Sequence, residues 1–361
     1  MQDSDSHQSS RGSLAAPPVV LVSTLHRGHA GRSGYPILAE YLSKDACITA
    51  TRSDPESFLP RICARLANRL AFSRWYVGGS AIAEWKCQRH LRHRPKSIVH
   101  MLWADLDLGF LDHYLNLRGD WFCGTFHHCS DTIASIIRFP RRLRRFAAVI
   151  LMSETQRAFM LDCGVSPERI HVVLHGVDTR HFTPPDHPTI NPWTVLSVGS
   201  YRRNFAALRA VCDALRTHPE IRVRIIGPPA VAPQFADLPN VVFEWGLTDE
   251  QLLDAYRSSS CFLMLVENAT ANNALLEAMA CGLPVIAERV GGIPEYVDTE
   301  CARLVAPGDI GSASTAIIEL HRSTESRSTM SRAARCRAEQ LDWKLVAANT
   351  SRVYESLFSQ G

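Results

Sequence analysis

The sequence predicts an α/β protein made of two doubly wound, Rossmann-like domains that face each other across a cleft. Two observations support this. Short β-rich runs alternate with longer helical stretches from residue 18 onward, and the alternation restarts after a proline-rich segment. This rhythm is typical of βαβ units, which build parallel sheets covered by helices on both faces. The length of 361 residues also fits two domains better than one.

The first domain is predicted over residues 17–183, with six strands. They are expected at 19–23, 47–51, 97–102, 121–126, 147–152 and 171–175. The Ser-rich residues 1–16 lack the charged start and apolar stretch of a secretory signal. We therefore expect a disordered tail before the first strand.

A linker is expected over residues 184–192, because four prolines in residues 183–192 disfavour both helix continuation and central strand pairing. The second domain is predicted over residues 193–341. Its strands are expected at 194–199, 222–227, 241–246, 261–266, 284–288 and 302–306. Residues 342–361 have apolar side chains at helical spacing, so we expect a C-terminal helix that crosses back over the domain junction.

Composition excludes several classes of protein. With 46% hydrophobic and 21% charged residues, the chain can bury a large core, which excludes wholesale disorder. The net charge of +3 gives no support for nucleic-acid binding by the whole chain. The longest apolar runs are far shorter than the ~20 residues that cross a bilayer. Eleven cysteines without a C-x-x-C pair favour a reducing, cytoplasmic compartment.

The most informative stretch is residues 261–297, which read as a complete βαβ unit. A polar turn follows the strand, and a helix is predicted from Asn272 to Cys281, ended by Gly282. Ligands of open α/β sheets bind outside the carboxyl ends of strands, and free amides at a helix N-terminus suit a phosphate group. The turn at 268–273 is therefore a candidate cradle for a diphosphate.

Glu277 lies four residues after Asn273, on the same helix face and about 6 Å along the axis at roughly 1.5 Å per residue. A ribose lies at about this distance from a phosphate. Spacing alone also allows a simple scaffold in which Glu277 is a solvated surface carboxylate.

The run ALLEAMACGLPVIA, followed by GGIPEYV, resembles the nucleotide-sugar-binding region of retaining glycosyltransferases of the GT-B fold, the family 4 group. Further segments agree in order, namely HRGHAGRSGY, TFHH, VLHGVD and VGSYRRNF. The resemblance covers roughly residues 18–358. It implies a nucleotide diphosphate sugar as donor substrate, a glycan or lipid-linked acceptor, and no further cofactor.

By this resemblance, Glu277 matches the second Glu of the family's Glu, seven residues, Glu motif and would bind the ribose hydroxyls of the donor. The first Glu of the motif falls on Ala269, and the nearest carboxylate, Glu267, sits two residues early. Three alternatives stay open. Glu267 could reach the donor sugar through a differently shaped turn, Asn272 and Asn273 could supply the contacts, or the protein could be an inactive relative.

Arg202 and Arg203 stand where the family places basic residues against the departing diphosphate, and Arg203 is our first choice for this role. A guanidinium can bind phosphate oxygens in a bidentate fashion and neutralise the charge that grows on the leaving group. Two solvated loop arginines are the alternative.

The resemblance also implies site residues on both sides of the cleft. Gly31 belongs to a G-x-x-G-x-x-G loop that relatives use near the donor phosphate or the acceptor. His127 matches a family histidine near the reacting sugar, although His128 could be the inward residue, since neighbours on an extended segment point opposite ways. Glu295 matches an acidic residue near the cleft, in direct contact with the donor or behind it.

No metal site is expected. Cys123, His127, His128 and Cys129 are close in sequence, but their spacing does not fit a zinc site. The Asp105-Leu106-Asp107 triplet imitates the D-x-D by which another glycosyltransferase fold binds a metal, and three residues are a frequent coincidence.

Residues 138–146, RFPRRLRRF, could form a basic amphipathic helix that touches anionic lipid at the inner membrane face, or a solvated basic surface. The protein would then be cytoplasmic and peripheral to the membrane.

The resemblance implies glycosyl transfer from a nucleotide diphosphate sugar to an acceptor hydroxyl with retention of configuration. We expect a front-face route, in which the departing phosphate helps to deprotonate the acceptor. The alternatives are a non-catalytic nucleotide-sugar-binding or partner-binding protein, which Ala269 motivates, and an epimerase or phosphorylase of similar architecture.

Overall fold

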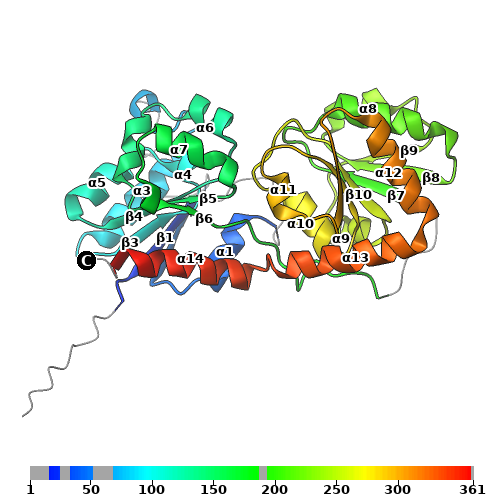
Figure 1. Cartoon of the computed structure of the whole chain (residues 1–361). Coiled ribbons are helices and arrows are strands. Elements are labelled where there is room, and N and C mark those ends of the chain that lie inside the picture. The colour runs from blue at the N-terminus through cyan, green and yellow to red at the C-terminus, as the bar shows by residue number, and fades with distance from the viewer. Residues whose placement is uncertain (1–15, 25–32, 52–67, 187–192, 359–361) are drawn as a thin grey trace, which may run out of the picture.

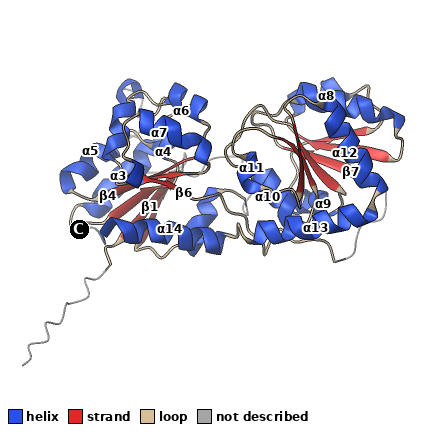
Figure 2. Ribbon diagram, in the orientation of Figure 1, coloured by secondary structure: helices blue, strands red, loops and turns tan. Residues whose placement is uncertain are grey.

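The computed structural model describes residues 16–24, 33–51, 68–186 and 193–358. Most of the expected tail, residues 187–192 of the expected linker and the loop glycines Gly28 and Gly31 lie outside these ranges. Two parallel six-stranded sheets, each flanked by helices, make up the fold (Figures 1 and 2). The α/β architecture with two doubly wound domains is confirmed.

The first sheet has the strand order β2-β1-β3-β4-β5-β6. Its strands are β1 (Val19–Thr24), β2 (Ala46–Ala50), β3 (Ile98–Met101), β4 (Trp121–Phe126), β5 (Ala148–Leu151) and β6 (Ile170–Val172). The α-helices of this half are α1 (Leu38–Tyr41), α3 (Gly78–Leu91), α4 (Ala104–Asp107), α5 (Leu111–Arg118), α6 (Ser130–Ile136) and α7 (Arg157–Asp162).

The second sheet has the order β12-β11-β10-β7-β8-β9. Its strands are β7 (Trp193–Val198), β8 (Ile221–Ile226), β9 (Val241–Glu244), β10 (Cys261–Met264), β11 (Val285–Glu288) and β12 (Ala302–Val305). The helices are α8 (Phe205–Ala214), α9 (Asp249–Arg257), α10 (Asn273–Ala280), α11 (Ile293–Tyr296), α12 (Ile310–Arg322), α13 (Thr324–Glu339) and α14 (Trp343–Phe358).

The strand order of the second sheet places its switch point between β7 and β10. The chain runs from β7 outward to β9, then returns to β10 on the other side of β7. At a switch point the two following loops diverge and leave a crevice beyond the strand ends, where ligands bind in open α/β sheets. A ligand site is therefore expected at the loops after β7 and β10.

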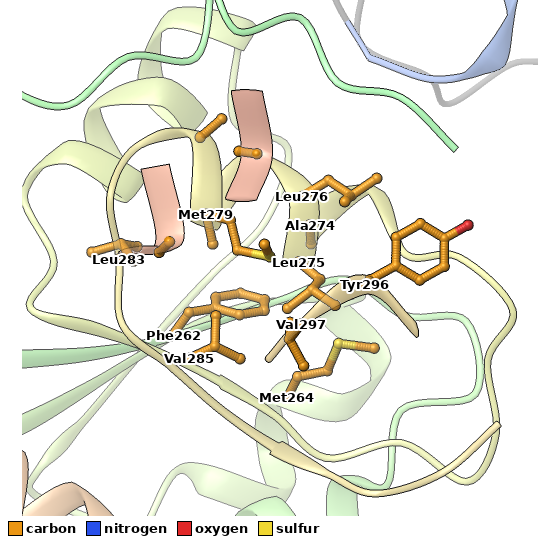
Figure 3. Close-up of a cluster of buried hydrophobic side chains, with 14 of the residues drawn as sticks. Phe262, Met264, Ala274, Leu275, Leu276, Met279, Leu283, Val285, Tyr296 and Val297 are labelled. Atoms are coloured by element: carbon orange, nitrogen blue, oxygen red, sulfur yellow. The ribbon is translucent and has the colours of Figure 1, made fainter. Parts of the chain in front are cut away.

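Helix α10 begins and ends where the sequence predicts. The Asn272 side chain caps it by accepting a hydrogen bond from the Leu275 amide, and Gly282 beyond its end has φ +76°, which glycine adopts without strain. Its apolar residues pack against β10 and β11, where Leu275 and Met279 gather with Phe262 and Val285 (Figure 3). With α13 also packed against it, α10 is buried almost all round, Glu277 included.

The C-terminal helix α14 crosses back onto the first domain, as expected (Figure 1). Trp343, Val346 and Val353 are buried in one cluster with first-domain residues such as Leu21. Tyr354 also bonds from this helix to the buried ring of His100, with 2.6 Å between its hydroxyl oxygen and Nδ1.

A lipid-binding amphipathic helix, one of the two alternatives for residues 138–146, does not form. Residues Pro140–Arg145 make a 3-10 helix, and Leu143 and Phe146 are fully buried in the first domain's core, so they are not available to lipid. Arg142 and Arg145 both bind the Asp112 carboxylate. A purely electrostatic contact between this segment and anionic lipid stays a prediction. None of the helices in the described ranges has the length and apolar character needed to span a bilayer.

Candidate active site

A cavity of about 550 Å³ lies between the two domains, within the size range of small-molecule sites. The first domain lines it with Ser33, Trp103, Leu106, His127, His128, Cys129 and His175. The second domain lines it with Val198, Gly199, Ser200, Tyr201, Arg203, Leu252, Asn268, Ala269, Thr270, Ala271, Asn272, Asn273, Ala274 and Glu277. The second group comes mainly from the loops after β7 and β10, at the switch point.

Arg203 is built into the cavity wall. Its side chain is 8% exposed, with Nε donating to the Val198 carbonyl at 2.9 Å and Nη2 donating to Asn272 Oδ1 at 3.2 Å. Its Nη1 is buried without a hydrogen-bond partner in the described part of the chain. Burial lowers the pKa of Arg203 to about 10, so the guanidinium still carries its charge at neutral pH. A buried cationic donor without a partner is costly, and an anion in the cavity would satisfy it.

Arg202 points elsewhere, although it is the next residue in the chain. It has φ +53° and is the one non-glycine residue with positive φ in the described ranges. Its guanidinium makes two hydrogen bonds to Asp131 of α6, at 2.9 and 2.7 Å, and it does not line the cavity. Arg202 therefore joins the two domains, which favours Arg203 over Arg202 for contact with the donor.

Glu277 lines the cavity and is 4% exposed. Its Oε1 accepts a hydrogen bond from Ser33 Oγ at 2.5 Å, and its Oε2 accepts one from the Tyr256 hydroxyl at 2.8 Å. Burial raises the pKa of the Glu277 carboxyl, and the two hydroxyl donors counteract this. The solvated-carboxylate alternative is therefore wrong. Sequence reasoning missed Tyr256, since a tyrosine on the buried face of α9 resembles any other core residue.

Asn272 and Asn273 both line the cavity at the start of α10. The Asn272 side-chain oxygen accepts from the Leu275 amide and from Arg203, so this residue links the helix cap to the buried cation. The first amides of a helix have no partner within it, and the helix dipole adds a partial positive charge. The helix start and Arg203 thus make one end of the cavity favourable for an anion.

Glu267 does not reach the cavity. Its side chain is exposed, and Glu267 is not among the residues that line the cavity. Its backbone amide donates to the Arg202 carbonyl at 3.0 Å, which holds the start of the turn in place. Ala269, at the position of the family's first Glu, is buried and does line the cavity. Of the alternatives for this motif, the geometry favours Asn272 and Asn273 over Glu267.

Gly291 and Gly292 pack closely against the backbone of this turn. A Cβ on Gly291 would lie 2.2 Å from the Ala269 carbonyl oxygen, and one on Gly292 would lie 2.4 Å from the Thr270 carbonyl oxygen. The Gly292 amide also donates to the Ala269 carbonyl at 2.8 Å. Only glycine allows this close approach of two backbone segments.

Glu295 binds the first domain, not the cavity. One of its oxygens accepts from Ser153 Oγ at 2.5 Å, and the Glu154 amide donates to the carboxylate at 2.9 Å. Glu295 does not line the cavity. Glu295 is therefore an interdomain contact, which favours a place behind the site over direct contact with the donor.

Both histidines after β4 line the cavity, on different neighbours. The His127 ring stacks on Trp103 with centroids 3.7 Å apart, and its Nε2 donates to the Leu102 carbonyl at 2.7 Å. A carbonyl only accepts, so the proton sits on Nε2 and Nδ1 keeps its lone pair. Burial lowers the pKa of His127 to about 3, so this ring is neutral. His128 Nδ1 instead binds Asp105 at 2.8 Å.

The D-x-D triplet is engaged in structural contacts. Asp105 accepts from the amides of His127 and His128, and Asp107 accepts from the hydroxyls of Thr24 and Ser80. Within the described ranges, no group of three or more His, Cys, Asp or Glu side chains is arranged to hold a metal ion.

The predicted donor contact of Gly31 lies outside the described residues. Of the same loop, Ser33 and Gly34 are described. Ser33 carries the contact to Glu277, and Gly34 has φ +93°, a conformation that glycine adopts readily.

Solved structures of glycosyltransferases share this architecture. Sucrose-phosphate synthase from Thermosynechococcus elongatus superposes with a TM-score of 0.70 and 18% identity, covering 96% of this chain and 100% of that one. Anabaena HepE in complex with UDP superposes with a TM-score of 0.67 and 12% identity, covering 94% and 100%. At these identities the likeness concerns the fold alone.

Two family models match the sequence, one in each domain. Glycosyltransferase Family 4 matches residues 37–181, and Glycosyl transferases group 1 matches residues 192–323. The chain belongs to the family 4-like glycosyltransferases of the GT-B fold. The cavity of this family member is lined from both matched regions, by Trp103 and His127 from the first and by Arg203 and Glu277 from the second.

The curated relatives of this family 4-like chain include transferases of several sugars. The MMP alpha-(1->4)-mannosyltransferase of Mycolicibacterium hassiacum is 30% identical over 236 residues, covering 61% of this chain and 56% of the relative. The sulfoquinovosyl transferase SQD2 of Arabidopsis thaliana is 28% identical over 264 residues, covering 65% and 48%. The chain thus spans about half the length of the curated relatives it matches.

Proposed function

We propose that this protein transfers a sugar from a nucleotide diphosphate sugar to an acceptor hydroxyl, with retention of configuration. The observation that carries the proposal is the pairing, in one interdomain cavity, of a buried guanidinium nitrogen that has no hydrogen-bond partner among the described residues and a buried carboxylate bound to hydroxyls. These are Arg203 Nη1 and Glu277. Family membership supports glycosyl transfer as the reaction class.

In this proposal Glu277 binds the ribose of the donor. A carboxylate accepts hydrogen bonds from hydroxyls, and Glu277 Oε1 already accepts one from Ser33 Oγ. The serine hydroxyl stands in for a ribose hydroxyl, which would take its place when donor binds. Tyr256 on Oε2 keeps the carboxylate in position for this exchange.

The diphosphate would lie at the start of α10, against Arg203. As the bond between sugar and phosphate breaks, negative charge grows on the diphosphate and positive charge on the sugar. A preorganised cation and helix N-terminus stabilise the former without having to reorganise. UDP in the Anabaena HepE structure supports a nucleoside diphosphate as product and donor fragment.

The proposed route is front-face transfer. Glu277 is the one carboxylate among the described residues that line the cavity, and both of its oxygens are engaged by hydroxyls. That leaves it poorly placed to attack the sugar as a nucleophile. The departing phosphate would then take the acceptor's proton on the same face, which gives retention.

The acceptor would enter from the first domain, where Trp103 and His127 line the cavity. We propose a glycan or a lipid-linked acceptor, as the resemblance to family 4 glycosyltransferases implies. We also propose transfer without a metal ion, because the two carboxylates of the D-x-D triplet are engaged by His128, Thr24 and Ser80.

The test is turnover of a panel of nucleotide sugars with sugar and lipid-linked acceptors, in buffer with and without a chelator. We expect release of a nucleoside diphosphate and, by NMR of the product, the donor's own anomeric configuration. An inverted anomeric centre would remove the front-face route.

A non-catalytic nucleotide-sugar-binding protein is the second candidate, because Ala269 replaces the carboxylate that the family motif expects and Glu267 lies outside the cavity. Such a protein would be stabilised against heat by a nucleotide sugar yet release no nucleoside diphosphate with any acceptor.

A further inference from the structure

His128 occupies a different part of the cavity from His127. Its ring meets Trp75 of the first domain edge-on at 5.1 Å and Tyr201 of the second domain edge-on at 5.8 Å. Tyr201 belongs to the same loop as Arg203, so His128 faces the part of the second domain that carries the buried cation. The two histidines therefore line the cavity beside different neighbours.

Asp105 fixes the tautomer of His128. The carboxylate is 0% exposed, and its Oδ2 accepts from the His127 amide at 2.8 Å, the His128 amide at 2.9 Å and His128 Nδ1 at 2.8 Å. An ionised carboxylate only accepts, so Nδ1 of His128 must carry a proton. The variable group is Nε2, which makes no hydrogen bond to the described residues and either keeps a lone pair or carries a second proton.

The surroundings favour the second proton. Asp105 is a buried negative charge, and its Oδ1 has no hydrogen-bond partner in the ranges that the structure describes. Neutralising His128 would leave that charge without a cation beside it, which is costly in a buried site. Burial alone would lower the pKa of His128, but the charge and hydrogen bond of Asp105 outweigh burial and raise it.

The other charged or titratable groups near His128 do not take over the role of Asp105, which is the negative charge that favours a second proton on the ring. Arg202, beside Tyr201, is neutralised by Asp131 of α6. His127 is neutral, since burial lowers its pKa to about 3. Burial raises the pKa of the Cys129 thiol, so the thiol stays protonated. Arg203 lines the cavity as a cation, and the described lining offers no carboxylate besides Glu277.

We propose that His128, held by Asp105, is a second anion-binding residue of the cleft, whose Nε2–H donates to a diphosphate oxygen of the donor together with Arg203. The inference rests on the proposed function and deepens it, because it makes donor binding dependent on one proton. The bound diphosphate favours protonated His128, so binding at alkaline pH draws a proton from solvent onto Nε2.

The probes for the test are UDP-glucose, GDP-mannose and ADP-glucose, whose diphosphate is esterified at both ends and does not titrate near neutral pH. Their dissociation constants would be measured by calorimetry between about pH 6 and pH 8.5. Above the pKa of His128, the dissociation constant of a bound probe should rise by up to about tenfold per pH unit.

The His128→Gln variant keeps a neutral N–H donor but cannot take the second proton. We expect it to bind about tenfold or more weakly near pH 6, since hydrogen bonds to charged groups are the strong ones, and to show little pH dependence. The matched control is His93→Gln, which changes an exposed histidine in the turn after α3 and should keep the wild-type profile. An unchanged pH slope in His128→Gln overturns the inference and leaves the proposed function standing.

A measurement on the wild-type protein covers the case in which the variant does not fold. The His128 ring, assigned in NMR spectra by its contacts to Trp75 and Tyr201, should titrate above the ordinary value of about 6.5. A pKa at or below that value overturns the inference. If no probe binds the wild-type protein at any pH, the proposed donor class fails first, and this inference fails with it.

Discussion

Tyr256 donates its hydroxyl hydrogen to Oε2 of Glu277 at 2.8 Å and thereby ties α9 to the buried carboxylate of α10. The tyrosine is 0% exposed, so this contact is shielded from water. With Ser33 on the other oxygen, Glu277 is held from both domains at once. The pair explains how a carboxylate can stay oriented toward the cavity inside an apolar helix environment.

Replacing Tyr256 with Phe should weaken donor binding by about tenfold, because Glu277 loses one of the two hydroxyls that orient it. The dissociation constant of a bound nucleotide sugar measures this. Tyr114→Phe is the matched control, since the Tyr114 hydroxyl bonds the Gln88 carbonyl in the first domain. Equal affinities for Tyr256→Phe and wild type would show that Tyr256 only fills space.

Replacing Glu277 with Ala should abolish the thermal stabilisation by nucleotide sugars, because the ribose loses its acceptor. Glu267→Ala is the control, as Glu267 is exposed and lies outside the cavity. We expect Glu267→Ala to keep the wild-type shift. A thermal stabilisation retained in Glu277→Ala would show that Glu277 does not bind the ribose. Its loss in Glu267→Ala would give that role to Glu267.

Replacing Arg203 with Ala should lower kcat by ~10²–10³, the usual effect of removing one preorganised donor to a developing anion. Arg202→Ala should change kcat by no more than about threefold, since the exposed ion pair of Arg202 with Asp131 contributes little. Steady-state kinetics on both variants compare adjacent residues of the same type. Similar losses in the two would mean that both touch the donor.

His100 makes the fold sensitive to acid. It is 0% exposed between Tyr354 and Thr125, and burial lowers its pKa to about 3. Below pH ~6.5 the unfolded chain binds a proton that the folded chain does not, so the free energy of unfolding falls as pH drops, by about 1.4 kcal/mol per pH unit. The contribution of the neutral His100 ring to the free energy of unfolding is fully present above pH ~6.5.

The His100→Gln variant isolates that effect. It should be less stable than wild type at neutral pH but lose about 2 kcal/mol less on going to about pH 5, as measured by urea unfolding. The raised pKa of Glu84 acts in the opposite direction, but it is present in both proteins and cancels in the comparison. Parallel pH profiles for the two proteins would contradict the assignment.

Much of the fold can be predicted from the sequence. All twelve predicted runs overlap strands of the two sheets, because buried parallel strands appear as short apolar runs between helices. Helix α10 was predictable from local signals, an Asn cap at its start and a glycine after its end. Residues 138–146 were not, since arginine spacing does not show that Asp112, from another helix, binds two of the arginines.

The site could be predicted only in part. Motif spacing and the family resemblance pointed to Glu277, and the resemblance alone pointed to Arg203; both residues line the cavity. Sequence reasoning preferred Arg203 but still placed Arg202 against the diphosphate as well, because the sequence does not show that the positive φ of Arg202 turns its side chain toward the other domain. It also missed Tyr256, whose role depends on a partner on another helix.

The central claim is tested most directly by a crystal structure with the nucleoside diphosphate of whichever nucleotide sugar stabilises the protein most. We predict a ribose hydroxyl on Glu277 in place of Ser33 Oγ, and phosphate oxygens within hydrogen-bond distance of Arg203 Nη1. A nucleotide bound elsewhere, with Ser33 Oγ still hydrogen-bonded to Glu277, would contradict the account.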